Sequence, residues 1–584
     1  MNYNLNIPHK TSTAAAFKKM LHFMKAEKRH LYFALAVMLL NSAITMLTPY
    51  LIGYTIDHYI QNRLYRGLML FSGILLGLYV LSAITDYWQT KLMGSIGQRM
   101  LFSLRNELFN KIQSLPVAFF NQNKSGDLIS RINNDTDKVN QFFSQSLMQF
   151  VDSIFMMLGA AVFILIIHVE LGAAALAPVV LVLIFVRLIS PLVKRKNAAS
   201  VKTTGSLSAE IQESLQNFKT IIAFNRRDYF REKFDKANHS NYKAAVGAGL
   251  ANTVFIPVFT LFTNIAQLVV LVFGIYLILQ GNFTIGLLIS FIAYTQVFYQ
   301  PLRQMAALWA SFQTAMASWD RIATIMDLKP DMSQMTVAPG SNGVPAALLQ
   351  FRDVSFHYPD GKEVLHHINL KLQKGKTYAL VGPTGGGKTT TASLMARLYD
   401  PTSGEIFFEG KNLKTYTNEQ RTQKIGFILQ EPFLFNGNVR DNILYGNQQY
   451  SKLSDDELRR RLQEAELDTL VDKFENGLST TVQSDGDSMS LGEKQLIAFI
   501  RAVLRQPAIL ILDEATANID TVTEKLLEQI LNKLPAETTR VTIAHRLNTI
   551  ENADEIFFVN SGQLTAAGNT EEALKLLLEQ KRES

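Results

Sequence analysis

A glycine-rich stretch that ends in a lysine and a threonine carries the clearest chemical signal in the sequence. Its residues are Gly382, Pro383, Thr384, Gly385, Gly386, Gly387, Lys388 and Thr389, with Thr390 directly after it. The apolar run 378–381 before the stretch predicts a buried strand, and residues 390–398 after it predict a helix. In this context the glycines let successive backbone N–H groups point at one anion, Lys388 can reach the outer phosphates of a nucleotide, and the Thr389 hydroxyl can ligate Mg²⁺. The stretch therefore predicts a nucleotide phosphate site, and its context argues against a chance glycine-rich turn.

The composition divides the 584-residue chain into an apolar first part and a more polar second part. Hydrophobic residues make up 48% and charged residues 18%, and the apolar excess lies before about residue 310. The net charge of +7 could indicate a nucleic-acid partner, but Lys and Arg are concentrated beside the apolar runs. Membrane topology explains them better, so no nucleic-acid partner is expected. The absence of cysteine excludes disulfides, thiolate catalysis and Cys-ligated zinc.

Six apolar segments in the first part are long enough to cross a membrane, since about 20 apolar residues span the hydrocarbon core. They lie near residues 31–56, 68–92, 145–168, 171–194, 254–280 and 284–309. The loops after the second and fourth segments are long and basic. In the short loops after the first, third and fifth segments, the only Lys or Arg residues are Arg63 and Arg66. Together with the basic N-terminus, which lacks a cleavable signal pattern, this bias predicts a multi-pass protein of the cell (inner or plasma) membrane. Both termini and both long loops are expected in the cytoplasm.

The two long loops, at about 93–144 and 195–253, have apolar residues spaced for helices, so we expect cytoplasmic extensions of the spanning helices. Residues 119–131 and 211–224 suit short crosswise helices at the two turns. At these turns a soluble nucleotide-binding domain could transmit movement to the spanning helices. An ordinary cap of a helical hairpin is the alternative. Two interpretations of residues 17–24 remain open, an amphipathic helix on the membrane surface and a flexible basic tail.

Few polar residues lie within the expected spans, and their depth makes them candidates for a substrate pocket or for pairing. Asn264 and Gln267, three apart on one helix face near mid-span, are the pocket candidates with the best position. Asp86 is another candidate, although it lies towards the cytoplasmic leaflet, where snorkelling or pairing would satisfy it. Hydrogen bonding between helices is the alternative for all of them. The full set is Asn41, Asp86, Arg187, Asn264, Gln267 and Gln296.

Residues 330–345 are rich in Pro, Gly, Ser and Asn, which is typical of a linker, and the alternation at 349–356 after them predicts a strand. From there the sequence resembles the nucleotide-binding domain of the ATP-binding cassette transporters, and the six-span part before it resembles their exporter-type transmembrane domain. The resemblance covers about residues 30 to 580 and implies an all-α six-helix transmembrane domain followed by an α/β P-loop domain. The expected divisions are a cytoplasmic segment (1–30), the transmembrane domain (31–325), a linker (326–346) and the nucleotide-binding domain (347–584).

The resemblance implies roles for residues outside the glycine-rich stretch. Tyr358 holds the place of the aromatic residue that stacks on adenine. Gln430 holds the place of the glutamine whose amide oxygen binds Mg²⁺ or the attacking water. His545 corresponds to the histidine that hydrogen-bonds the γ-phosphate, and Asp520 belongs to the D-loop, which touches the partner's site.

Two adjacent carboxylates follow the apolar run 508–512, which predicts a buried strand with both acids at its tip. Asp513 resembles the carboxylate that holds Mg²⁺, and Glu514 resembles the general base that activates the attacking water. Acidic residues often end strands, but their combination with the phosphate loop favours the catalytic interpretation.

Residues 489–495, at the start of a helix that extends to 502, resemble the signature that closes on the γ-phosphate of ATP bound to the opposite subunit. Ser490 and Gly492, which make that contact, are present. Met489 replaces the usual Leu, Leu491 replaces the first usual Gly, and Glu493 replaces the usual Gln. Family members with an altered signature sometimes work beside a different chain, so a homodimer and a heterodimer are both open.

One chain supplies six spans and one motor, which is half of the family's working unit, so a second half-transporter is the expected partner. The leading hypothesis is an exporter that uses ATP and Mg²⁺ to move amphipathic drugs, lipids or peptides by alternating access. An exporter-fold importer and an ATP-gated channel or regulatory subunit are the alternatives. A soluble ATPase of the DNA-repair or translation type would share the motor, but the six spans argue against it.

Overall fold

The structure is a computed structural model, and it describes residues 3, 5, 20, 27–328, 347–358, 361–430, 432–447, 449–483, 489–513, 521–544, 552–568, 571, 572 and 575. The chain divides into two compact units. The helical unit comprises Pro8–Ile112 and Gly126–Asp327, and the sheet unit comprises Met1–Ile7, Gln113–Ser125 and Leu328–Ser584. The possible surface helix at 17–24, apart from Met20, and the linker residues 329–346 lie outside the described residues.

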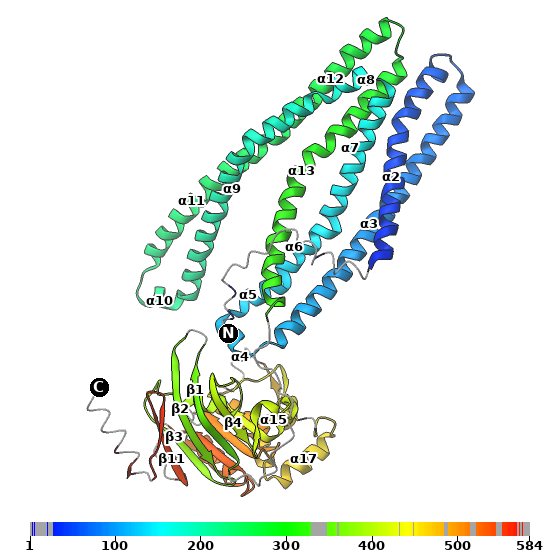
Figure 1. Cartoon of the computed structure of the whole chain (residues 1–584). Helices are drawn as coiled ribbons and strands as arrows, with labels where there is room; N and C mark the ends of the chain where they lie inside the picture. The colour runs from blue at the N-terminus through cyan, green and yellow to red at the C-terminus, as the bar shows by residue number, and fades with distance from the viewer. Residues whose placement is uncertain are drawn as a thin grey trace. The chain divides into compact units, whose positions relative to one another are not determined.

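The helical unit consists of long helices joined by short turns (Figure 1). Within the described residues, six helical stretches are long and apolar enough to cross a membrane, which confirms the predicted number of spans. Helices suit this environment because they satisfy every backbone polar group internally. The elements are α2 (Lys28–Thr55), η2 (Ile56–Ile60), α3 (Tyr65–Gln113), α5 (Ser125–Ser130), η3 (Arg131–Asp135), α6 (Thr136–Gln141), η4 (Phe142–Ser146), α7 (Leu147–Ile167), α8 (Val169–Leu176), α9 (Pro178–Gln216), α10 (Phe218–Ala223), α11 (Arg227–Thr253), α12 (Phe255–Leu279) and α13 (Ile285–Met326).

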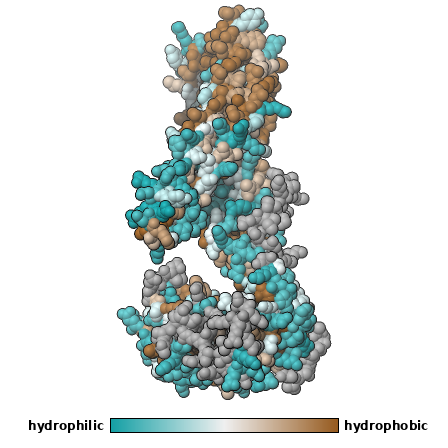
Figure 2. All heavy atoms as spheres, turned by 90° about the vertical axis from the view of Figure 1, so that its left-hand side faces the viewer, coloured by the Kyte–Doolittle hydropathy of each residue, from teal (hydrophilic) through white to brown (hydrophobic). Residues whose placement is uncertain are grey.

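The core of the helical unit lies where α7, α8, α12 and α13 pack together, with α2 contributing Met46. Small side chains such as Ala160 and Ala266 are fully buried there, and they allow the helices to approach closely. The Tyr299 hydroxyl donates a 2.9 Å hydrogen bond to the Ala175 carbonyl oxygen, which fastens α13 to α8. Figure 2 shows hydrophobic side chains gathered over one end of the helical unit, as expected for a surface that contacts lipid.

The turns of the two long loops contain short helices. The single helix expected at residues 119–131 is interrupted, because Asn123 has an extended backbone, with φ −125° and ψ 136°. The helix α4 (Val117–Gln122) ends before Asn123, and α5 begins after it. The α4 helix belongs to the sheet unit, whereas α5 continues into the helical unit. In the second loop, α10 lies at the turn between α9 and α11, which run side by side (Figure 1).

The sheet unit contains a six-stranded sheet of order β12-β11-β3-β10-β9-β6 and a four-stranded sheet of order β2-β1-β4-β5, with a small β7-β8 pair. The helical first part and this α/β part confirm the predicted fold class. The strands are β1 (Leu349–His357), β2 (Glu363–Leu372), β3 (Thr377–Val381), β4 (Ser403–Phe408), β5 (Lys411–Asn412), β6 (Ile425–Ile428), β7 (Gly437–Asn438), β8 (Thr481–Val482), β9 (Ile509–Asp513), β10 (Thr539–Ile543), β11 (Glu555–Asn560) and β12 (Gln563–Ala566). The helices are α14 (Lys388–Met395), α15 (Asn418–Lys424), α16 (Val439–Leu444), α17 (Asp455–Glu464), α18 (Asp468–Val471), α19 (Leu491–Val503) and α20 (Thr521–Asn532), with single turns η5 (Leu413–Thr415) and η6 (Gly477–Ser479).

The centre of the larger sheet is parallel. Strand β10 pairs with β3 on one side and β9 on the other, and β6 pairs with β9. Strands β3 and β9 are mostly apolar and buried, as expected for strands that are covered on both faces. Their carboxyl ends meet at one edge, so the loop after β3 and Asp513 at the end of β9 are brought together.

Candidate functional site

The glycine-rich loop joins β3 to α14 at the carboxyl edge of the sheet. Gly382 has φ +143°, and a Cβ there would lie 2.1 Å from the Val559 carbonyl oxygen, so only glycine fits. Gly385 has φ +82°, and a Cβ there would meet no atom within 4 Å. One side of the loop therefore packs on β11, and the other side faces open space large enough for an anion to approach the backbone.

Lys388 is the first residue of α14, and it lies within the curve of the loop with 6% exposure. Its Nζ atom donates hydrogen bonds of 2.9 Å to the carbonyl oxygens of Gly382 and Pro383. The ammonium group is thus placed at the N-terminus of a helix, where the backbone also favours negative charge. An anion that enters the loop would meet both the ammonium and the N–H groups.

Two oxygen atoms of the kind that ligate hard metal ions lie close together beside the loop. Thr389 Oγ1 donates a 3.3 Å hydrogen bond to Asp513 Oδ1 at the end of β9. Hydroxyl and carboxylate oxygens suit Mg²⁺, which usually takes its other ligands from phosphate and water. Among the described residues, no group of three or more His, Cys, Asp or Glu gathers to form an all-protein metal site. The residues present therefore fit a Mg²⁺ ion that is shared with a nucleotide.

Tyr358 lies on the same cavity as the loop. Its hydroxyl shares a 3.0 Å hydrogen bond with Thr390 Oγ1, and its ring meets those of Phe356 and Tyr399 edge-on at 5.0 and 5.5 Å. The cavity has a volume of about 340 Å³. Its lining consists of Tyr358, Lys362, Val364, Thr384, Gly385, Gly387, Lys388, Thr389 and Thr390.

Gln430 follows β6, the strand beside β9, at the same edge of the sheet. Arg501 of α19 connects that helix to the segment after Gln430. Arg501 donates hydrogen bonds of 3.2 Å to the Phe433 carbonyl oxygen and 2.7 Å to the Asn442 carbonyl oxygen, and its guanidinium lies 5.4 Å from the centre of the Tyr445 ring. Burial lowers the pKa of Arg501 to about 10. No sequence pattern marks this residue, because its role depends on contacts between distant segments.

Ser490 is the N-cap of α19 and forms a capping box with Glu493. The Ser490 hydroxyl and backbone N–H donate to Glu493 Oε2 at 2.9 and 2.7 Å, and the Glu493 N–H donates to Ser490 Oγ at 3.3 Å. Glu493, one of the three altered residues of the signature, therefore helps to cap the start of α19. No described residue of α19 lines the cavity of the glycine-rich loop.

Comparison with known proteins agrees with this arrangement. Residues 31–302 match the ABC transporter transmembrane region, and residues 365–517 match the ABC transporter domain. The chain is 32% identical over 94% of its length to an uncharacterized ABC transporter ATP-binding protein, YfiC, of Bacillus subtilis, and it covers 91% of that protein. The chain belongs to the ABC transporter family.

Other relatives in the family are named for lipid cargo. A fatty acid ABC transporter ATP-binding/permease protein of Mycobacterium bovis is 33% identical over 85% of this chain and 78% of its own length. An ATP-dependent lipid A-core flippase of Syntrophus aciditrophicus is 29% identical over 96% of this chain and 92% of its own. This ABC transporter is thus an exporter-type multi-pass membrane protein that fuses its transmembrane and ATP-binding domains, and its ATPase is coupled to transport.

Three predicted site residues of the ABC transporter lie outside the described residues, namely Glu514, Asp520 and His545. The segments that carry them leave β9 after Asp513 and β10 after Ile543. Because β9 and β10 are parallel neighbours, both segments start at the edge that holds Lys388 and Thr389.

The predicted pocket residues of the helical unit lie on α12 and α3. Asn264 is exposed and Gln267 is half-buried on α12, and within the described residues neither hydrogen-bonds Asp86. Asp86 Oδ1 instead accepts a 2.6 Å hydrogen bond from Asn41 Nδ2. A further carboxylate, Asp152, accepts a 3.4 Å hydrogen bond from Ser42 Oγ. Asp152 lies within the predicted span 145–168, so the cost of a charge at membrane depth could have identified it.

Proposed function

We propose that this ABC transporter is one half of a dimeric ATP-driven exporter of amphipathic compounds, which include lipids, drugs or peptides. The observation that carries the proposal is that Tyr358 and the loop of Lys388 line one cavity, to which α19 contributes no described residue. A nucleotide in the cavity would therefore take its remaining cover from α19 of a second half-transporter. The relatives named for fatty acid and for lipid A-core support an amphipathic cargo.

Within this proposal, the loop amides and Lys388 bind the phosphates, and Tyr358 stacks on adenine. Thr389, Asp513 and Gln430 hold Mg²⁺, which supplies charge neutralisation at the phosphates. The 3.3 Å contact between Thr389 Oγ1 and Asp513 Oδ1 supports this assignment, since it places two oxygen atoms of the kind that bind Mg²⁺ next to each other.

The remaining predicted site residues act in ATP hydrolysis or at the site of the partner subunit. Glu514 orients and deprotonates the attacking water, and His545 contacts the γ-phosphate. The residues that act on the partner's site are Ser490, Leu491, Gly492, Glu493 and Asp520. ATP binding closes the two motors, and hydrolysis reopens them.

The proposed arrangement in the cell follows the charge pattern. The N-terminal segment 1–30 and the ATP-binding domain 347–584 lie in the cytoplasm, and the transmembrane domain 31–325 lies in the cell membrane. The basic residues of the two long loops support this orientation.

The test uses the purified transporter in proteoliposomes and the variant Glu514→Gln. The wild-type protein is expected to hydrolyse ATP and to move a fluorescent amphipathic compound across the bilayer. The variant should bind ATP but lose both turnover and movement, because it lacks the general base. Movement that continues in the variant when ATP is bound would instead indicate an ATP-gated channel, and movement in the opposite direction would indicate an importer.

Whether the partner is a second copy or a different chain is decided by the mass of the complex. Purification from native membranes is expected to give a two-chain assembly. Recovery of a functional single chain would contradict the proposed half-transporter.

A further inference from the structure

Two carboxylates meet the same turn of α2 from different helices. Asn41 Nδ2 donates a 2.6 Å hydrogen bond to Asp86 Oδ1 of α3, and Ser42 Oγ donates a 3.4 Å hydrogen bond to Asp152 Oδ1 of α7. Asn41 and Ser42 are adjacent in the chain and are both buried. Neighbouring residues of α2 therefore hold two negative groups that are far apart in the sequence.

These carboxylates have no basic partner in the described part of the helical unit. None of its ion pairs includes Asp86 or Asp152. Lys91, a nearby basic residue on α3, has its Nζ atom over the rings of Trp88 and Tyr87, at 5.2 and 5.7 Å from their centres. Among the described residues, no basic side chain therefore forms an ion pair with either carboxylate.

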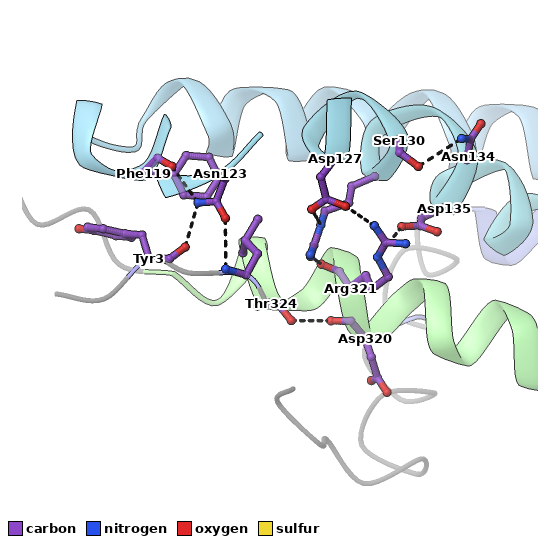
Figure 3. Close-up of polar contacts among 12 residues, drawn as sticks. Tyr3, Phe119, Asn123, Asp127, Ser130, Asn134, Asp135, Asp320, Arg321 and Thr324 are labelled. Carbon is purple, nitrogen blue, oxygen red and sulfur yellow. Dashed lines mark hydrogen bonds and ion pairs between the residues drawn. The ribbon is translucent and has the colours of Figure 1, made fainter. Parts of the chain in front are cut away.

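Two acidic residues elsewhere in the same unit form ion pairs with arginine, which provides a contrast. Arg321 Nη2 lies 2.5 Å from Asp127 Oδ1, and Arg321 Nε lies 3.2 Å from Asp135 Oδ2 (Figure 3). Arg131 Nε lies 2.8 Å from the other oxygen of Asp127. Asp127 and Asp135 thus join helices through Arg321, whereas no described arginine forms an ion pair with Asp86 or Asp152.

The unbalanced pair lies within the predicted spans. Asp86 belongs to the span 68–92 and Asp152 to the span 145–168. Asn41, which bonds Asp86, is about 15 Å along α2 from the start of the span 31–56, at about 1.5 Å per residue. Asp86 is nevertheless exposed on the helical unit. Because a carboxylate at this depth is too costly to face lipid, this face of α3 lines a space that holds water, a ligand or the partner half.

A buried acceptor without a hydrogen-bond partner among the described residues lies one turn along α3 from Asp86. The Gln89 side chain is 4% exposed, and its Oε1 atom has no hydrogen-bond partner among the described residues. Gln89 is one turn from Asp86 and lies on the face of α3 that carries Thr85, whose hydroxyl donates to Asn41 Oδ1 at 2.9 Å. A buried acceptor that lacks a donor is costly, so the site favours an incoming group that donates or carries positive charge.

We propose that Asp86 and Asp152, together with Gln89 Oε1, bind the cationic group of an amphipathic substrate. This inference rests on the proposed export function and names its substrate class. Asn41 and Ser42 orient the two carboxylates, and the apolar surfaces of the spanning helices take the hydrophobic part of the substrate. The site disfavours anionic cargo such as a fatty acid, because it would add a third negative charge.

The test compares two probes of the same shape and opposite charge, tetraphenylphosphonium and tetraphenylborate, with the transporter in phosphatidylcholine vesicles. Binding is measured by equilibrium dialysis without ATP, and stimulation of ATP hydrolysis is measured relative to each variant's own basal rate. The wild-type protein is expected to bind the phosphonium at least about tenfold more tightly than the borate, since charge complementarity sets the preference.

The variants Asp86→Asn and Asp152→Asn keep groups that can accept from Asn41 and Ser42, so they remove charge while retaining the hydrogen bonds. Each should weaken phosphonium binding about tenfold or more, and Asp86→Glu and Asp152→Glu should restore it. Glu170→Gln, which removes an exposed negative charge in the first turn of α8, is the matched control and should leave phosphonium binding unchanged.

Equal binding of the two probes, or phosphonium binding that is unchanged in both Asn variants, would overturn the inference. Failure of the proposed function is a separate result, because it shows as absent ATP hydrolysis or absent cargo movement whatever the probe charge. The dialysis measurement does not depend on turnover, so it decides the inference in either case. If an Asn variant fails to fold, the Glu variant at the same position and the probe preference of the wild-type protein still decide it.

Discussion

Asn121 Nδ2 of α4 donates a 2.7 Å hydrogen bond to the Tyr399 hydroxyl, and the Tyr399 ring lies 5.5 Å from the Tyr358 ring, edge to face. Burial raises the pKa of the Tyr399 hydroxyl, so it stays protonated at neutral pH. Tyr399 therefore connects α4, which lies between the second and third spans, to Tyr358, which lines the cavity of the glycine-rich loop.

Tyr399→Phe should weaken the communication between cargo and ATPase. The variant keeps the ring against Tyr358 but loses the bond to α4, so ATP affinity should change less than about twofold while cargo stimulation of hydrolysis falls severalfold. The measurement is the ATPase rate with and without cargo. Tyr416→Phe, which removes a hydroxyl that bonds the Phe408 carbonyl oxygen within the same unit, is the control. If cargo stimulates ATP hydrolysis as strongly in Tyr399→Phe as in the wild type, the hydrogen bond between Asn121 and Tyr399 does not carry this communication.

Tyr358→Ala should weaken ATP binding by roughly 1–3 kcal/mol, the scale of stacking between a base and an aromatic ring. Tyr358→Phe keeps the ring and loses only the hydrogen bond to Thr390, so its affinity should stay near that of the wild type. Titration with a fluorescent ATP analogue measures both. An Ala variant with unchanged affinity would remove Tyr358 from the site.

Asn123→Ala should release the N-terminus from α4. Asn123 accepts from the Leu5 N–H at 3.2 Å and donates to the Tyr3 carbonyl oxygen at 3.0 Å and to the Phe119 carbonyl oxygen at 2.7 Å (Figure 3). Tyr3 is 2% exposed and meets the Phe119 ring edge-on. Since each net hydrogen bond is worth about 0.5–1.5 kcal/mol, amide exchange at Leu5 should become at least about tenfold faster. Asn134→Ala, which loses one exposed contact to Ser130, serves as the control and should leave that exchange rate unchanged.

The parts that could be predicted are those whose signals are local. The loop at Gly382, the strand that ends at Asp513 and the six spans each follow from a short pattern of residue types. The assignment of α4 to the sheet unit could not be predicted, because it depends on contacts such as that between Asn121 and Tyr399, which are distant in the chain. Asp86 was recognised as unusual, but its pairing with Asn41 depends on helix rotation, which the sequence does not give.

Glu493→Gln should strengthen ATP-driven closure of the proposed dimer. Glu493 places a carboxylate at the N-terminus of α19, where the helix dipole stabilises it in the isolated chain. If this end of α19 meets the γ-phosphate bound by the partner, the same carboxylate repels it. Glutamine can still accept from Ser490 and complete the capping box, so the variant removes the repulsion without removing the cap.

A second capping box in the same unit provides the control. Ser454 and Glu457 of α17 have nearly the same geometry, with contacts of 2.8, 2.9 and 3.3 Å. Glu493→Gln should lower the ATP concentration for half-maximal hydrolysis severalfold, because a like-charge contact is removed, whereas Glu457→Gln should leave it unchanged. Equal effects of the two variants would mean that Glu493 acts only as a cap, and a weaker ATP response in Glu493→Gln alone would mean that its charge assists closure.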